Sequence, residues 1–209
     1  MPPTARIAAA AIAAITWFGL AVQCIVLYQQ NASVRLTLWI VFAFFTITTN
    51  LLVAAVFTAI ALNRTALRKE WIVAGTMLSI LLVGVIYALL LHGLVELSGG
   101  SAIANVLLHM VTPVIVTLFW IAFIPKGHLT KHHPFLWAIY PLAYLAYALV
   151  RGTATNNYAY PFLNVLQLGW LQTSLNAAII AAAFMFCGYT LVWIDRRLAR
   201  SHHRAKPLL

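Results

Sequence analysis

Long apolar segments separated by short polar ones run along the 209-residue chain. Charge-poor runs of about 18 or more apolar residues are long enough to cross a bilayer as helices. The pattern predicts an all-α, polytopic membrane protein: a six-transmembrane-helix bundle forming one integral membrane domain over residues 1–209. The first segment is longer than the apolar region of a signal peptide and is expected to remain as a helix. The expected helices span 7–28, 36–62, 72–95, 103–124, 135–151 and 173–194.

Basic residues strongly outnumber acidic ones, with 13 Lys and Arg against 3 Asp and Glu. Six spans would place the N-terminus, the 63–71 and 125–134 loops and the C-terminal tail on one side of the membrane. Eleven of the 13 basic residues lie there, whereas Arg35 and Arg151 lie on the other side. By the positive-inside rule, both termini are expected in the cytoplasm. The charge thus indicates orientation and contact with membrane lipids, and nucleic acid is not an expected partner.

A histidine stands in the middle of the uncharged run 97–125, in the segment Asn105-Val-Leu-Leu-His109-Met-Val-Thr112-Pro113. An imidazole at membrane depth is costly without partners, and it usually faces a bundle interior or a water-filled cavity. Asn105 and Thr112 share its helix face. Because Pro113 has no N–H, the His109 carbonyl loses its helical partner and a kink is expected. These residues indicate a site, with ordinary polar bonding between helices as the alternative.

The second predicted helix carries Thr46, Thr49 and Asn50 at positions i, i+3 and i+4, a polar stripe in an apolar helix. Threonine hydroxyls in membrane helices often bond the carbonyl four residues earlier, so the two threonines alone do not indicate a functional site. An amide in hydrocarbon, by contrast, is expected to find a partner on another helix. At 1.5 Å per residue, this stripe and His109 both fall in the outer half of the bilayer.

The fifth predicted helix presents Tyr140, Tyr144, Tyr147 and Arg151 on one continuous face. The guanidinium at its outer end suits an anionic lipid head group or a carboxylate. Alternatively, Arg151 only extends to the interface and the tyrosines pack against neighbouring helices.

The connection 152–172 is uncharged, aromatic and long for a compact domain, and it includes Tyr160 and Asn164. It is expected to fold back over the outer half of the bundle. The polar faces of the second, fourth and fifth helices would then share one cavity. Such a cavity suits a lipid substrate with an apolar tail and a carboxylate.

The acidic residues limit the chemistry of this cavity. Only Glu70, Glu96 and Asp195 exist, all near predicted membrane boundaries, so a Ser-His-Asp triad cannot assemble at membrane depth. A hydroxyl–imidazole dyad remains, in which a threonine of the second helix is activated by His109 as general base. Candidate donors to an oxyanion are Asn50, Asn105 and Asn164.

No metal or other cofactor is expected. The three histidines of the 126–134 loop have no Cys, Asp or Glu beside them, which is typical of a basic loop rather than a metal site. Haem bound within a bundle commonly has paired histidines, and only His109 is deep.

Several motifs occur in a characteristic order: Phe45-Thr46-Ile-Thr-Thr-Asn50, Asn105-x-x-x-His109, Tyr140-Pro-Leu-x-Tyr144, Tyr147 to Gly152, and Tyr160-Pro-Phe-Leu163. Together, over most of the chain, they resemble the androgen-induced membrane hydrolase family, and more closely its bacterial six-span branch. The resemblance implies an enzyme that hydrolyses fatty acid esters of hydroxy fatty acids with a threonine nucleophile and an essential histidine.

Carried over by position, the resemblance implies Thr46 as nucleophile and His109 as the histidine, with Thr49 as the alternative nucleophile. The residues then expected to bind substrate are Asn50, Asn105, Tyr144, Tyr147, Arg151, Tyr160 and Asn164. The competing hypothesis is a non-catalytic lipid-binding or transport protein with a cavity around His109. Transport is less favoured because the sequence has no internal repeat and no discontinuous pair of spans.

Overall fold

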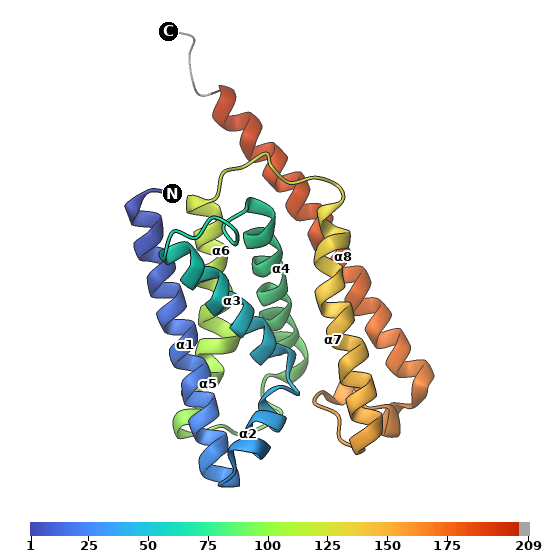
Figure 1. Cartoon of the computed structure of the whole chain (residues 1–209). Coiled ribbons are helices and arrows are strands. Elements are labelled where there is room, and N and C mark those ends of the chain that lie inside the picture. The colour runs from blue at the N-terminus through green and yellow to red at the C-terminus, as the bar shows by residue number, and fades with distance from the viewer. Residues whose placement is uncertain (205–209) are drawn as a thin grey trace. The chain divides into compact units, whose positions relative to one another are not determined.

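The computed structural model describes residues 1–204, which form helices and no strands (Figure 1). Two short segments, η1 and η2, are π-helical, and η3 is a 3₁₀ turn. In chain order the elements are α1 (Pro3–Asn31), α2 (Val34–Val41), α3 (Phe45–Ala61), α4 (Glu70–Ile86), η1 (Tyr87–Leu91), α5 (Gly99–Val106), η2 (Leu107–Val111), α6 (Thr112–Phe123), α7 (His133–Thr155), η3 (Pro161–Leu163) and α8 (Val165–Arg204). The chain divides into two compact units, residues 1–124 and residues 125–209.

Within the described residues, five helices are long and apolar enough to cross a membrane, and a sixth span arises if the bent pair α2–α3 counts as one. The five are Pro3–Asn31, Glu70–Leu91, Gly99–Phe123, His133–Thr155 and Val165–Arg200. Large apolar side chains such as Phe18, Leu89 and Phe186 are exposed on them. Large exposed apolar side chains on helices of this length suit lipid contact. The prediction of a helical membrane bundle is confirmed at this level.

The second predicted span is not the single helix expected over 36–62. α2 and α3 meet at a bend of 91°. The helical path from α2 is interrupted because Phe44 adopts an extended conformation, with φ −103° and ψ 129°. Before it, the amides of Ala43 and Phe44 bond back to the carbonyls three residues earlier, which tightens the last turn. As a result, Thr46 lies in the first turn of α3.

The distortion expected near Pro113 takes the form of the π-helical turn η2. Pro113 itself sits in the first turn of α6, where its missing N–H costs little. The hydroxyl of Thr112 donates to the carbonyl of Leu107, five residues earlier, at 2.9 Å. Turns of this kind occur mostly as single bulges within α-helices, frequently at functional sites. η2 carries His109.

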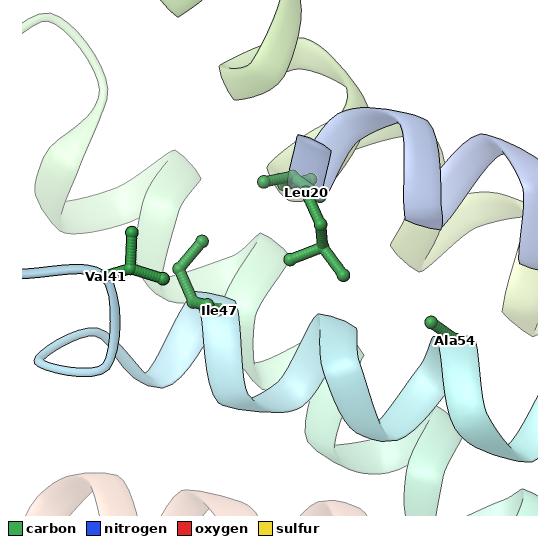
Figure 2. Packing of buried hydrophobic residues seen from close by; sticks show 5 residues of the cluster. Leu20, Val41, Ile47 and Ala54 are labelled. Atoms are coloured by element: carbon green, nitrogen blue, oxygen red, sulfur yellow. The ribbon is translucent and has the colours of Figure 1, made fainter. Parts of the chain in front are cut away.

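A cluster of buried side chains in the first unit packs beside this turn (Figure 2). Two of its members, Ile47 of α3 and Leu108 of η2, are chain neighbours of Thr46 and His109. Burial of these two side chains therefore fixes the backbone on either side of the polar pair. The cluster consists of Leu20, Val41, Ile47, Ala54 and Leu108.

Two glycines allow neighbouring helices to approach η2 closely. A Cβ on Gly19 of α1 would lie 2.9 Å from the Leu108 side chain. A Cβ on Gly84 of α4 would lie 3.2 Å from the carbonyl oxygen of His109. The π-turn is thus held between α1 and α4.

In the second unit, α7 and α8 run side by side (Figure 1). Both extend beyond their predicted ends, so the long connection expected over 152–172 is wrong in extent. α7 continues to Thr155, and α8 begins at Val165 before bending at Gly169. The intervening residues include η3, which is bonded to α8 through the Asn176 amide and the Phe162 carbonyl at 3.0 Å.

Asp195 of α8 anchors the loop that precedes α7. Its carboxylate is buried and accepts hydrogen bonds from the backbone N–H groups of Gly127 at 2.8 Å and Leu129 at 3.0 Å. Burial lowers the pKa of Lys126 in this loop, and the Asp195 charge opposes that shift. The loop and the C-terminal part of α8, with its arginines, therefore lie at the same end of this unit. Lys206 of the predicted basic side lies outside the described residues.

Candidate functional site: a threonine–histidine pair

The site centres on a hydrogen bond between two spans of the first unit. The Thr46 hydroxyl oxygen, in the first turn of α3, lies 3.1 Å from Nε2 of His109 in η2. The Thr46 side chain is buried and His109 is partly buried. The structure thus brings together the threonine and the histidine that the sequence singled out, although 63 residues separate them.

The second ring nitrogen of His109 determines which atom donates in this bond. Nδ1 lies 3.2 Å from the backbone carbonyl of Asn105, one turn earlier. A carbonyl can only accept, so Nδ1 carries the proton, and in a neutral imidazole Nε2 is then an acceptor. The Thr46 hydroxyl therefore donates to Nε2. A general base requires this orientation of the ring.

Asn50 connects the two elements that carry the pair. Its amide nitrogen donates to the carbonyl of Thr46 at 2.8 Å and to the carbonyl of Leu108 at 3.2 Å. These two acceptors fix which end of the side chain is nitrogen. The oxyanion role predicted for Asn50 does not follow from this geometry, because both amide protons point to backbone carbonyls. Its oxygen Oδ1 is buried without a hydrogen-bond partner.

Thr49, the alternative nucleophile, is fully buried on α3. The hydrogen bond to the His109 ring comes from Thr46 and not from Thr49. Of the two threonines, Thr46 therefore has the geometry of an activated hydroxyl.

Tyr87 also contacts the site, although it is not among the candidate residues of the sequence analysis. Its ring lies against the His109 ring, with centroids 4.5 Å apart and planes tilted by 31°. The side-chain amide of Asn105 donates to its hydroxyl at 2.6 Å. Tyr87 lies at the start of η1, on a different span from both Thr46 and His109. Helical periodicity shows which residues share a face of one helix, but it does not reveal a contact of this kind between spans.

The other predicted substrate-binding residues lie in the second unit. Arg151 donates to the hydroxyl of Tyr147 at 2.7 Å, and the rings of Tyr144 and Tyr147 are 6.1 Å apart. Tyr160 is buried and stacks on Phe162. Asn164 Oδ1 accepts from the N–H groups of Leu166 and Gln167 at the start of α8, so this oxygen caps the helix.

Fold and site together define a multi-pass helical membrane protein with a hydroxyl–imidazole pair between two of its spans. Within residues 1–204, no group of three or more His, Cys, Asp or Glu side chains is arranged to hold a metal ion. Comparison with protein-family models, with curated proteins and with solved structures finds no match to this chain.

Proposed function

We propose that this protein is an intramembrane lipid-ester hydrolase with Thr46 as nucleophile and His109 as general base. The observation that carries the proposal is the 3.1 Å hydrogen bond between them, together with the hydrogen bond that His109 Nδ1–H donates to the Asn105 carbonyl. A neutral imidazole fixed in this tautomer is ready to take a proton from the threonine. This pair, rather than the fold, is the reason to assign hydrolysis.

In the first half of the reaction, Thr46 Oγ attacks the ester carbonyl carbon and its proton passes to His109 Nε2. The tetrahedral intermediate collapses, the bond to the alcohol oxygen breaks, and the leaving alcohol takes the proton from Nε2. In the second half, water attacks the acyl-threonine ester and gives its proton to Nε2. Expulsion of Thr46 Oγ, which recovers that proton, releases the carboxylic acid and restores the pair.

The position of Thr46 in α3 also suits this chemistry. The N-terminal end of a helix carries partial positive charge, which favours an anion formed within its first turn. The break between α2 and α3 places this end of the helix at Thr46. Developing negative charge on the substrate oxygen would therefore be stabilised without a side-chain amide.

The proposed substrate is a fatty acid ester of a hydroxy fatty acid. The lipid-facing helices of the first unit give such a molecule access from the membrane. We also infer that both termini lie in the cytoplasm, because the basic residues are distributed so unevenly along the chain.

The test is hydrolysis and covalent labelling by the purified protein. The wild type should release fatty acid from a branched fatty-acid ester and react with a fluorophosphonate probe. Thr46→Ala and His109→Ala should each lower turnover by about 10²-fold or more. Thr48→Ala, which removes a neighbouring hydroxyl that donates to the Phe45 carbonyl on the same helix, is the matched control and should retain turnover. Labelling lost in Thr49→Ala but kept in Thr46→Ala would assign the nucleophile to Thr49.

A second candidate is a lipid-binding or transport protein without catalysis. The 91° break in the α2–α3 span favours it, because discontinuous helices often form substrate sites in transporters. The sequence analysis expected no discontinuous pair of spans, and the described residues contain one such break. A folded wild type that binds a lipid ester but neither cleaves it nor reacts with the probe would support this candidate and overturn the hydrolase.

A further inference from the structure

The proposed reaction creates a positive charge that the site must accommodate. When Thr46 gives up its proton, His109 becomes an imidazolium at membrane depth, where an unpaired charge is costly. In catalytic triads a buried carboxylate stabilises this cation. Here the side chain of His109 contacts Thr46, Asn105 and Tyr87, and none of them is a carboxylate.

The aromatic ring of Tyr87 lies where that stabilisation is needed. Its centroid is 4.5 Å from the centroid of the imidazole, and the planes are tilted by 31°, so the face of the phenol is turned toward the histidine. A cation within about 6 Å of an aromatic face is attracted by the negative charge of the ring quadrupole. The attraction is larger when both groups are shielded from water, as in a partly buried position between spans.

A hydrogen bond holds the phenol in this orientation. The Asn105 side-chain amide donates to the Tyr87 hydroxyl at 2.6 Å, and the backbone carbonyl of Asn105 accepts the His109 Nδ1 proton at 3.2 Å. One residue therefore orients both rings. The edge contact with His92, 5.6 Å away at 82°, borders the same phenol from another direction.

We propose that Tyr87 takes the role that a carboxylate has in a triad: a positioning residue whose ring stabilises the His109 imidazolium through a cation–π interaction. The inference rests on the proposed hydrolase function and deepens it. No atom of Tyr87 exchanges a proton in the reaction. The ring acts only while the cation exists, so it lowers the barrier to attack more than it strengthens substrate binding.

The test replaces Tyr87 with phenylalanine and then with mono-, di- and trifluorinated phenylalanine in the full-length protein. Fluorine withdraws electron density from the ring face at nearly constant shape, so a packing role is little affected. With a fatty-acid ester as substrate, kcat should fall stepwise along the series, by roughly 2- to 30-fold in total. KM should stay close to constant. The same series at Tyr28 of α1, which does not contact His109, is the control and should leave kcat unchanged.

Two outcomes separate the failure of this inference from the failure of the hydrolase proposal. A series with constant kcat, in a protein that hydrolyses the ester and is inactivated by Thr46→Ala, would overturn the cation–π role. Tyr87→Leu should lose at least as much activity as the trifluorinated ring, and full activity in that variant would also overturn it. If the wild type neither hydrolyses the ester nor reacts with a fluorophosphonate, the proposed function itself fails.

Discussion

Asn50 is the residue that determines how Thr46 and His109 meet. Its two amide hydrogen bonds reach the backbone of Thr46 on its own helix and of Leu108 on the neighbouring span. Both acceptors are at or next to a member of the pair. A side chain that bonds only within its own helix would leave the two spans free to shift, whereas Asn50 fixes their register.

The same side chain keeps an oxygen without a hydrogen-bond partner. Asn50 Oδ1 is buried and unpaired, and such a group typically costs about 1–3 kcal/mol. The reversed amide would be less stable still, because its oxygen would then face the two carbonyl oxygens of Thr46 and Leu108. The arrangement is therefore specific for asparagine rather than for any polar side chain of this size.

We predict that Asn50→Asp strongly impairs both stability and activity. Aspartate has nearly the same shape but cannot donate to the Thr46 and Leu108 carbonyls when ionised, and it brings negative charge against them. The expected loss of stability is about 2 kcal/mol or more. This corresponds to a fall of about 4–8 °C in the thermal midpoint for a chain of this size. Thermal unfolding in detergent and ester hydrolysis measure the two effects.

The control is Asn31→Asp near the end of α1. The Asn31 amide donates to the carbonyl of Leu27 on its own helix at 2.8 Å and joins no second element. Its substitution should change stability by about 0.5 kcal/mol or less. Equal effects at both positions would contradict the idea that Asn50 matters as a link between spans.

At the scale of elements, the π-turn η2 orients the His109 side chain toward Thr46. A π-turn contains one more residue per turn than an α-helix. A regular α-helix through 107–111 would therefore point the His109 side chain in a different direction relative to Asn105. The turn is stabilised from within by the Thr112 hydroxyl on the Leu107 carbonyl. It is stabilised from outside by the close approach of α4 at Gly84.

We predict that Gly84→Ala lowers catalysis by displacing this turn. A Cβ at position 84 would lie 3.2 Å from the His109 carbonyl oxygen and 3.2 Å from the Pro113 ring, tighter than ordinary van der Waals contact. A shift of a few tenths of an ångström lengthens the bond between Thr46 and His109. The expected result is a fall of about 10-fold in kcat with a smaller change in KM.

Val85→Ile is the matched control for this substitution. It also adds one carbon to α4, but Val85 is exposed on the apolar surface. Its kcat should therefore match the wild type. Steady-state hydrolysis measures both variants, and wild-type kcat in Gly84→Ala would show that the turn tolerates the displacement.

Elements were predictable from sequence where periodicity and length carried the signal. The apolar runs gave the existence of the spans, and Pro113 marked the distortion near His109. The break between α2 and α3 was not predictable, because the residues at the bend are Phe42, Ala43 and Phe44, without proline or glycine. The π-turn was also missed, since its identity depends on contacts with other helices rather than on residue spacing.

The site itself was predictable only in part, for the same physical reason. Spacing identified Thr46 and Asn50 on one helix face and Asn105 and His109 on another, because each set lies within a single helix. It did not identify Tyr87, whose contacts with Asn105 and His109 depend on how two spans pack. The role of Asn50 likewise becomes visible only with the Leu108 carbonyl beside it.

At the scale of the whole molecule, the number of membrane crossings determines the orientation of every loop. If α2 and α3 together cross the membrane, the chain has six crossings and its two termini lie on the same side. If the bent pair enters and leaves on the same side, the chain has five crossings, and every loop after α3 changes sides. With a cytoplasmic N-terminus, five crossings would place Arg64, Arg68 and Lys69 outside the cell. That arrangement conflicts with the positive-inside rule, so the charge distribution favours six.

We therefore predict that residue 65 faces the cytoplasm and residue 98 the outside. The measurement is labelling of intact cells with a membrane-impermeant maleimide, using single cysteines at Gln30, Thr65 and Ser98 with Cys24 and Cys187 replaced by alanine. Gln30→Cys, at the end of the first span, is labelled from outside in both arrangements and serves as the control. Six crossings predict that Ser98→Cys is labelled and Thr65→Cys is protected. The reverse pattern would make α2–α3 a re-entrant pair, so that Thr46 would lie at the turn of a loop that does not cross the membrane.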